Sequence, residues 1–90
     1  MKKSLHVIIT GNVQGVNFRS YVHKQALELK LAGWVRNNKD GTLEAVFEGE
    51  EKNLQKMFLL CKKGPLRARI KNVQEEWWEI LQWFTEFKVI

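Results

Sequence analysis

The stretch Gly11-Asn12-Val13-Gln14-Gly15-Val16-Asn17-Phe18-Arg19 joins a strand-like apolar run to an amphipathic helix. Glycines let the backbone turn tightly, so that successive N–H groups curve around one point, and the helix start adds partial positive charge there. Arg19 falls in the first helical turn, where the helix dipole disfavours a cation unless an anion is bound. Its planar guanidinium can hold two oxygens of a phosphate at once. We therefore predict a phosphate-binding loop formed by Gln14, Gly15, Val16, Asn17, Phe18 and Arg19.

The alternative is a tight turn that binds nothing and carries a solvated arginine. The charge pattern favours an anion site, because no Asp or Glu precedes Glu28 in the sequence. The net charge of +5 by itself admits nucleic acid, an anionic membrane or a small anion as the partner. The local sequence around Arg19, rather than the net charge, therefore indicates a small anion as the partner.

Length and composition indicate one small domain. The chain has 90 residues, of which 44% are hydrophobic, and it contains a single cysteine, Cys61. We expect one domain over residues 1–90, and the lone cysteine excludes an internal disulfide and suits a reducing compartment. The apolar run Val7-Ile8-Ile9 is too short for a signal peptide, and no segment approaches the roughly 20 apolar residues that span a bilayer. We therefore expect a cytoplasmic protein without a membrane partner.

Apolar periodicity predicts an alternation of strands and helices. Residues at helical spacing predict one helix that begins at Phe18 and ends near Gly33, and a second over 50–63 that is ended by Gly64-Pro65. Alternating or β-branched runs predict strands over 5–10, 34–37, 42–48, 68–78 and 84–90, with a bulge or late start where Ile70 and Val73 lie three residues apart. This order predicts an α+β, ferredoxin-like split βαβ sandwich, with two helices packed on one face of a four- to five-stranded antiparallel sheet.

A second glycine-containing cluster strengthens the functional reading. Gly33-Trp34-Val35-Arg36-Asn37 is followed by Gly41 and Gly49, four and twelve residues after the asparagine. With residues 11–19, which match the pattern G-x-V-Q-G-V-x-F-R throughout, this cluster resembles the acylphosphatase family. The resemblance covers nearly the whole chain and implies hydrolysis of acyl phosphates to carboxylate and orthophosphate, with no metal or other cofactor. It assigns catalysis to Arg19 and Asn37. Asn17 and Asn38 depart from the residues common in the family.

The residues make chemical sense of that reaction. The leaving carboxylate has a conjugate acid of pKa about 4, so no general acid has to protonate it. Catalysis then requires only that the phosphoryl group is positioned and that the charge on its oxygens is stabilised. Arg19 and the backbone amides from Gln14 to Phe18 would do both. Asn37 would orient a water for in-line attack on phosphorus. An amide is too weak a base to remove the proton, which we expect to pass to a phosphoryl oxygen.

Other chemistries find little support in the sequence. Thiolate phosphatases carry a cysteine six residues before their arginine, where this chain has Val13, and no His, Cys or Asp cluster has metal-ligand spacing. We expect Ser20 and His23 to be non-catalytic, Cys61 to be a core residue, and the tryptophans near the C-terminus to cover the sheet. The partners expected are therefore a small-molecule acyl phosphate and phosphate, bound by a monomer.

Two rival functions remain open at this point. An RNA-binding module can use the same fold, but residues 42–48 carry Glu44 and Glu48 instead of the basic, doubly aromatic pattern of such modules. Nucleic acid is therefore an unlikely partner. A non-catalytic module that binds phosphate or carbamoyl phosphate is the second rival, and an assay of benzoyl phosphate hydrolysis separates it from an enzyme.

Overall fold

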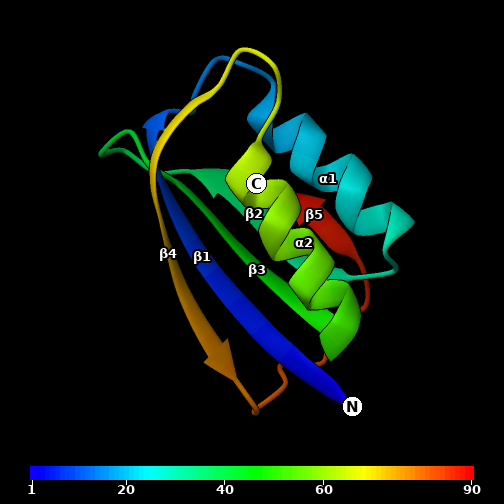
Figure 1. Cartoon of the computed structure of the whole chain (residues 1–90). Coiled ribbons are helices and arrows are strands. Elements are labelled where there is room, and N and C mark those ends of the chain that lie inside the picture. Colours follow the sequence, from blue (N-terminus) through cyan, green and yellow to red (C-terminus); the bar gives the residue numbers. More distant parts are fainter.

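The computed structural model describes residues 1–90 and contains a five-stranded sheet with both helices on one face (Figure 1). The elements are β1 (Lys2–Asn12), α1 (Phe18–Glu28), β2 (Ala32–Asn37), β3 (Leu43–Glu50), α2 (Glu51–Lys63), β4 (Arg69–Trp78) and β5 (Phe87–Val89). The strand order across the sheet is β4-β1-β3-β2-β5. The predicted split βαβ sandwich with helices on one face is confirmed. Neither helix is long and apolar enough to cross a membrane.

The sheet is mixed, whereas the sequence predicted an antiparallel one. The pairs of β1 with β3, β1 with β4 and β2 with β3 are antiparallel, but β5 runs parallel to β2. The reason is the path of the chain after β4. Residues 79–86 cross from one edge of the sheet to the other at the end where β4 finishes and β2 begins, so β2 and β5 start from the same end. β5 is also shorter than the predicted strand over 84–90.

β1 extends beyond the predicted range of 5–10 because it is paired on both sides, with β3 and with β4. The register with β4 shifts between Thr10 and Gly11, which skips Lys71 and confirms the predicted bulge. Gly11 has φ 138°, and a Cβ atom there would lie 2.1 Å from the carbonyl oxygen of Arg69. Gly11 therefore lets β4 approach β1. Gly11 belongs to β1 and lies outside the predicted loop of residues 14–19, in which Gly15 is the only glycine.

The core lies between the sheet and the helices. Leu5, Val7 and Ile9 alternate along β1 and are fully buried, as the period of two requires. They pack in one cluster with the apolar faces of both helices, which include Phe18, Val22, Ala26, Leu54, Met57 and Cys61. Burial raises the pKa of the Cys61 thiol to about 12, as expected for an inert core side chain. The core fixes α1 against the sheet and thereby fixes the loop before it.

One end of the sandwich collects three connections. The loop between β1 and α1, the turn between β2 and β3, and the loop between α2 and β4 all lie at the same end (Figure 1). Gly64 follows α2 directly and packs against α1, because a Cβ atom on Gly64 would lie 3.3 Å from the ring of Phe18. The loop after α2 therefore begins next to the start of α1.

Candidate active site

The loop between β1 and α1 has an unusual backbone. Gly15 (φ 74°) and Asn17 (φ 64°) are both in the left-handed region, and Asn17 directly precedes α1. Asparagine is among the few residues other than glycine that adopt this conformation readily. No N–H group from Gln14 to Ser20 donates a hydrogen bond to a protein acceptor. The loop and the first helical turn therefore present a row of free donors, which is the chemistry of an anion site.

A cavity of about 180 Å³ lies against this loop. Its lining comes from the loop, the first turn of α1 and the end of β2, and consists of Val13, Gly15, Asn17, Phe18, Arg19, Ser20 and Asn37. The two residues that the sequence assigns to catalysis, Arg19 and Asn37, are thus brought to one cavity although eighteen residues separate them in the sequence. Val13 and Phe18 are buried and form its apolar side.

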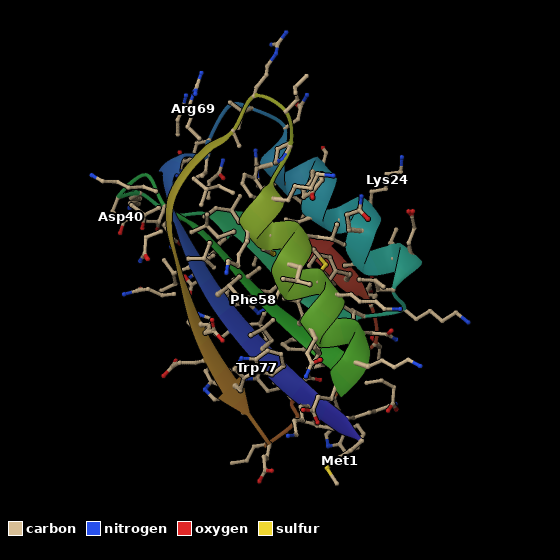
Figure 2. All side chains as sticks on the ribbon, viewed as in Figure 1. Met1, Lys24, Asp40, Phe58, Arg69 and Trp77 are labelled. Carbon is tan, nitrogen blue, oxygen red and sulfur yellow. The ribbon has the colours of Figure 1, made fainter.

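Arg19 is exposed in the first turn of α1 and forms no ion pair. The segments 1–27 and 52–74 contain no Asp or Glu, whereas the neighbouring turn between β2 and β3 carries Asp40. Both segments reach this end of the molecule. Arg69, at the start of β4, pairs in register with Asn12 at the end of β1, and Figure 2 shows it beside the loop. Arg19 and Arg69 thus place two basic side chains near unpaired backbone donors, which favours the approach of an anion.

Asn37 is the last residue of β2 and is half-buried. Its side-chain oxygen, Oδ1, is buried and accepts no hydrogen bond from the protein. It is the one buried side-chain polar atom in the chain without a partner. Such atoms are rare in folded proteins because each costs about 1–3 kcal/mol, so an unpartnered acceptor on a residue that lines the cavity makes Asn37 a candidate for a ligand contact.

Gln14 and Val16 differ from the other predicted ligand-binding residues, because their side chains do not line the cavity. The side-chain amide of Gln14 donates to the backbone carbonyls of Asn38 (2.8 Å) and Thr42 (3.0 Å). Gln14 therefore ties the loop to the turn between β2 and β3. The predicted contribution of these two residues rests on their backbone N–H groups, which remain free.

Val13 and Ser20 line the cavity although the sequence reasoning did not include them. The alternation of Leu5, Val7 and Ile9 predicts an inward side chain at Val13, which is a signal that could have been used. Ser20 is exposed and follows Arg19 in the first helical turn. His23 lies away from the cavity, with its ring centroid 6.1 Å from that of Phe87. No group of three His, Cys, Asp or Glu side chains is arranged to hold a metal ion.

Comparisons with known proteins identify the family of this chain. The sequence profile of the acylphosphatase family matches residues 5–89. An acylphosphatase of Pelotomaculum thermopropionicum is 46% identical over 84 residues, which cover 93% of this chain and 91% of that protein. The crystal structure of acylphosphatase from Bacillus subtilis superposes with a TM-score of 0.95 at 33% identity, over 100% of this chain and 99% of the other. An acylphosphatase structure from Coxiella burnetii gives 0.94 at 36% identity, over 99% and 93% of the two chains. The chain belongs to the acylphosphatase family.

Proposed function

We propose that this enzyme hydrolyses acyl phosphates by in-line attack of water on phosphorus, with the phosphoryl group held by residues 14–19 and the water oriented by Asn37. The bond from the water oxygen to phosphorus forms as the bond from phosphorus to the acyl oxygen breaks. The carboxylate leaves with the bonding electron pair. The water proton passes to a phosphoryl oxygen, so the products are a carboxylate and orthophosphate.

The free donors of the loop support the phosphoryl-binding role. The N–H groups from Gln14 to Ser20 have no protein acceptor, and the guanidinium of Arg19 has no carboxylate partner. Charge spreads over the phosphoryl oxygens in the transition state, and donors fixed in advance stabilise that charge without reorganising. Arg19 can place two parallel N–H groups on two of these oxygens.

The orphaned oxygen of Asn37 is the observation that carries the assignment of the water. Oδ1 is an acceptor without a donor beside the cavity that Arg19 also lines. A water that donates one proton to Oδ1 would be held with a lone pair free to attack phosphorus. The amide does not need to act as a base, because the phosphoryl oxygen of the substrate takes the proton.

The leaving group explains why this machinery suffices. A carboxylate is a good leaving group near neutral pH, since its conjugate acid has a pKa of about 4. The proposed reaction needs neither a general acid nor a covalent nucleophile nor a metal ion. A phosphate monoester with a more basic leaving group would lack the proton that it requires.

The test is the hydrolysis of benzoyl phosphate by the purified enzyme in the presence of EDTA. We expect turnover to be unaffected by EDTA and hydrolysis of p-nitrophenyl phosphate to be far slower. Loss of activity on chelation with recovery on adding a divalent metal would overturn the mechanism. Binding of phosphate without any turnover of benzoyl phosphate would support the rival binding module.

We also propose that the enzyme acts as a monomer in the cytoplasm on a small-molecule substrate. The single cysteine is buried, unpaired and part of the core, which suits a reducing compartment. Size-exclusion chromatography tests the monomer, for which we expect the elution volume of a 10.6 kDa protein.

A further inference from the structure

Glu44 of β3 contacts both residues that flank Asn37 in the chain. Its Oε1 atom accepts hydrogen bonds from Arg36 Nη2 at 3.0 Å and from Asn38 Nδ2 at 3.1 Å. Its Oε2 atom lies 2.6 Å from His6 Nε2 on β1. An ionised carboxylate only accepts, so His6 is the donor of this bond. One carboxylate on β3 thus joins the two neighbours of Asn37 to His6 on β1, the next strand of the sheet.

The strand geometry explains how Glu44 can act on Asn37 without touching it. Glu44 is paired in register with Arg36, and Asn37 with Leu43. Because successive side chains of a strand point to opposite faces, Arg36 and Asn38 lie on the face that carries Glu44, and Asn37 points to the face where the cavity lies. Holding the two neighbours from behind restricts the backbone of Asn37 and leaves its side-chain oxygen without a hydrogen bond from the protein.

The contacts around Glu44 are close and mutually supporting. Its side chain is only 16% exposed, and Arg36 Nε also donates to Asn38 Oδ1 at 3.0 Å, which joins the two flanking residues directly. Burial alone would raise the pKa of Glu44, but hydrogen bonds from His6, Asn38 and Arg36 and the charge of Arg36 outweigh it, so the pKa is lowered. The carboxylate is therefore ionised at neutral pH, and its charged oxygens accept stronger hydrogen bonds than neutral ones would.

We propose that Glu44 is a positioning residue that holds Asn37 Oδ1 at the edge of the cavity through Arg36 and Asn38. This inference rests on the proposed function, in which Asn37 orients the attacking water. Misplacement of a catalytic group by even about 1 Å can lower a rate on the order of 10²-fold, so a residue that touches no substrate can still control turnover. Phosphate binding is assigned to the loop, which reaches the turn through the side chain of Gln14 and the backbone carbonyls of Asn38 and Thr42, so we expect it to depend little on the Glu44 side chain.

The test is a set of variants assayed for kcat with benzoyl phosphate and for Ki of inorganic phosphate. We expect Glu44→Ala to lower kcat by about tenfold with Ki within twofold of the parent enzyme. Glu44→Gln keeps an oxygen acceptor facing Arg36 and Asn38, and we expect it to restore most of kcat. Glu76→Gln is the matched control, because Glu76 lies 3.5 Å from His6 but contacts neither flanking residue, and its kcat should be unchanged.

A double-mutant cycle with Asn37→Ala shows whether Glu44 acts through Asn37. We expect Glu44→Ala to have little further effect once Asn37 is replaced. An equal loss in both backgrounds, an unchanged kcat in Glu44→Ala, or a rise in Ki parallel to the loss of kcat would each overturn the proposal. If Glu44→Ala does not fold, Arg36→Ala removes one flank from an exposed position and should lower kcat at constant Ki. If Asn37→Ala lowers kcat strongly and neither Glu44→Ala nor Arg36→Ala does, the positioning role of Glu44 is refuted. The proposed role of Asn37 then still stands.

Discussion

The two ends of the sheet differ in how far their polar groups are satisfied. At the end where β1 begins, the terminal ammonium of Met1 lies 2.8 Å from Glu50, and the buried carboxylate of Glu48 accepts from Ser4 and from the backbone of residues 82 and 84. At the other end, Arg19 and the neighbouring N–H groups have no protein partner, and Asn37 Oδ1 is an orphaned acceptor. Satisfied polar contacts occur at both ends, including those of Gln14 and Glu44 at the second, but these unpartnered groups collect at the end that carries the loop.

Arg19 belongs to the end with unpartnered groups, and its replacement should lower both phosphate affinity and kcat. Arg19→Lys keeps the charge but loses the two-pronged contact, so phosphate affinity and kcat should each fall about tenfold or more, equivalent to about 1.4 kcal/mol. Arg19→Gln also removes the charge, and we expect a loss of about 10²-fold. Arg19 has no ion pair, and its charge opposes the helix dipole. The Tm of Arg19→Gln should therefore be unchanged or slightly higher than that of the parent enzyme. Full activity in Arg19→Lys would show that the two-pronged contact of the guanidinium is not required and that its charge is sufficient.

The satisfied end should respond in the opposite way to Glu48→Ala. Glu48 is 7% exposed, and its removal leaves the N–H groups of Gln82 and Phe84 without their acceptor. We expect a loss of about 2 kcal/mol in the free energy of unfolding, measured by urea denaturation, with kcat unchanged. Glu86→Ala, at an exposed position, is the control and should change stability by less than about 0.5 kcal/mol. A large loss of kcat in folded Glu48→Ala would remove the separation between the two ends.

A smaller effect should follow from the backbone of Asn17. With φ 64°, Asn17 is in a conformation that alanine adopts at a cost of about 1 kcal/mol and that glycine adopts freely. We expect Asn17→Ala to lower the free energy of unfolding by about 1 kcal/mol and Asn17→Gly to leave it within about 0.5 kcal/mol. Equal stability of the two variants would show that the left-handed turn is not what limits this position.

The features predictable from the sequence are those carried by local patterns. The spacing of Phe18, Val22 and Ala26 predicted α1, and the extra residue between Ile70 and Val73 predicted the bulge. The local motifs also pointed to Arg19 and Asn37, which line one cavity in the structure.

The features that the sequence could not predict depend on contacts between segments that are far apart in the chain. The parallel pairing of β5 with β2 follows from the path of residues 79–86 across the sheet, which no local pattern encodes. The need for glycine at position 11 arises from the carbonyl of Arg69, 58 residues further along the chain. The contacts of Glu44 with His6 and Arg36 likewise require the strand order, so Glu44 looked like an ordinary exposed residue of a half-buried strand.

The most direct test of the account is a paired measurement on Asn37→Ala, shown to be folded by circular dichroism. The substitution removes the proposed water-orienting oxygen and leaves the loop and Arg19 in place. We expect kcat for benzoyl phosphate to fall by about 10²-fold or more, while Ki for inorganic phosphate stays near that of the parent enzyme. A rise in Ki in step with the loss of kcat would contradict the account, because Asn37 would then act in binding phosphate or in holding the loop.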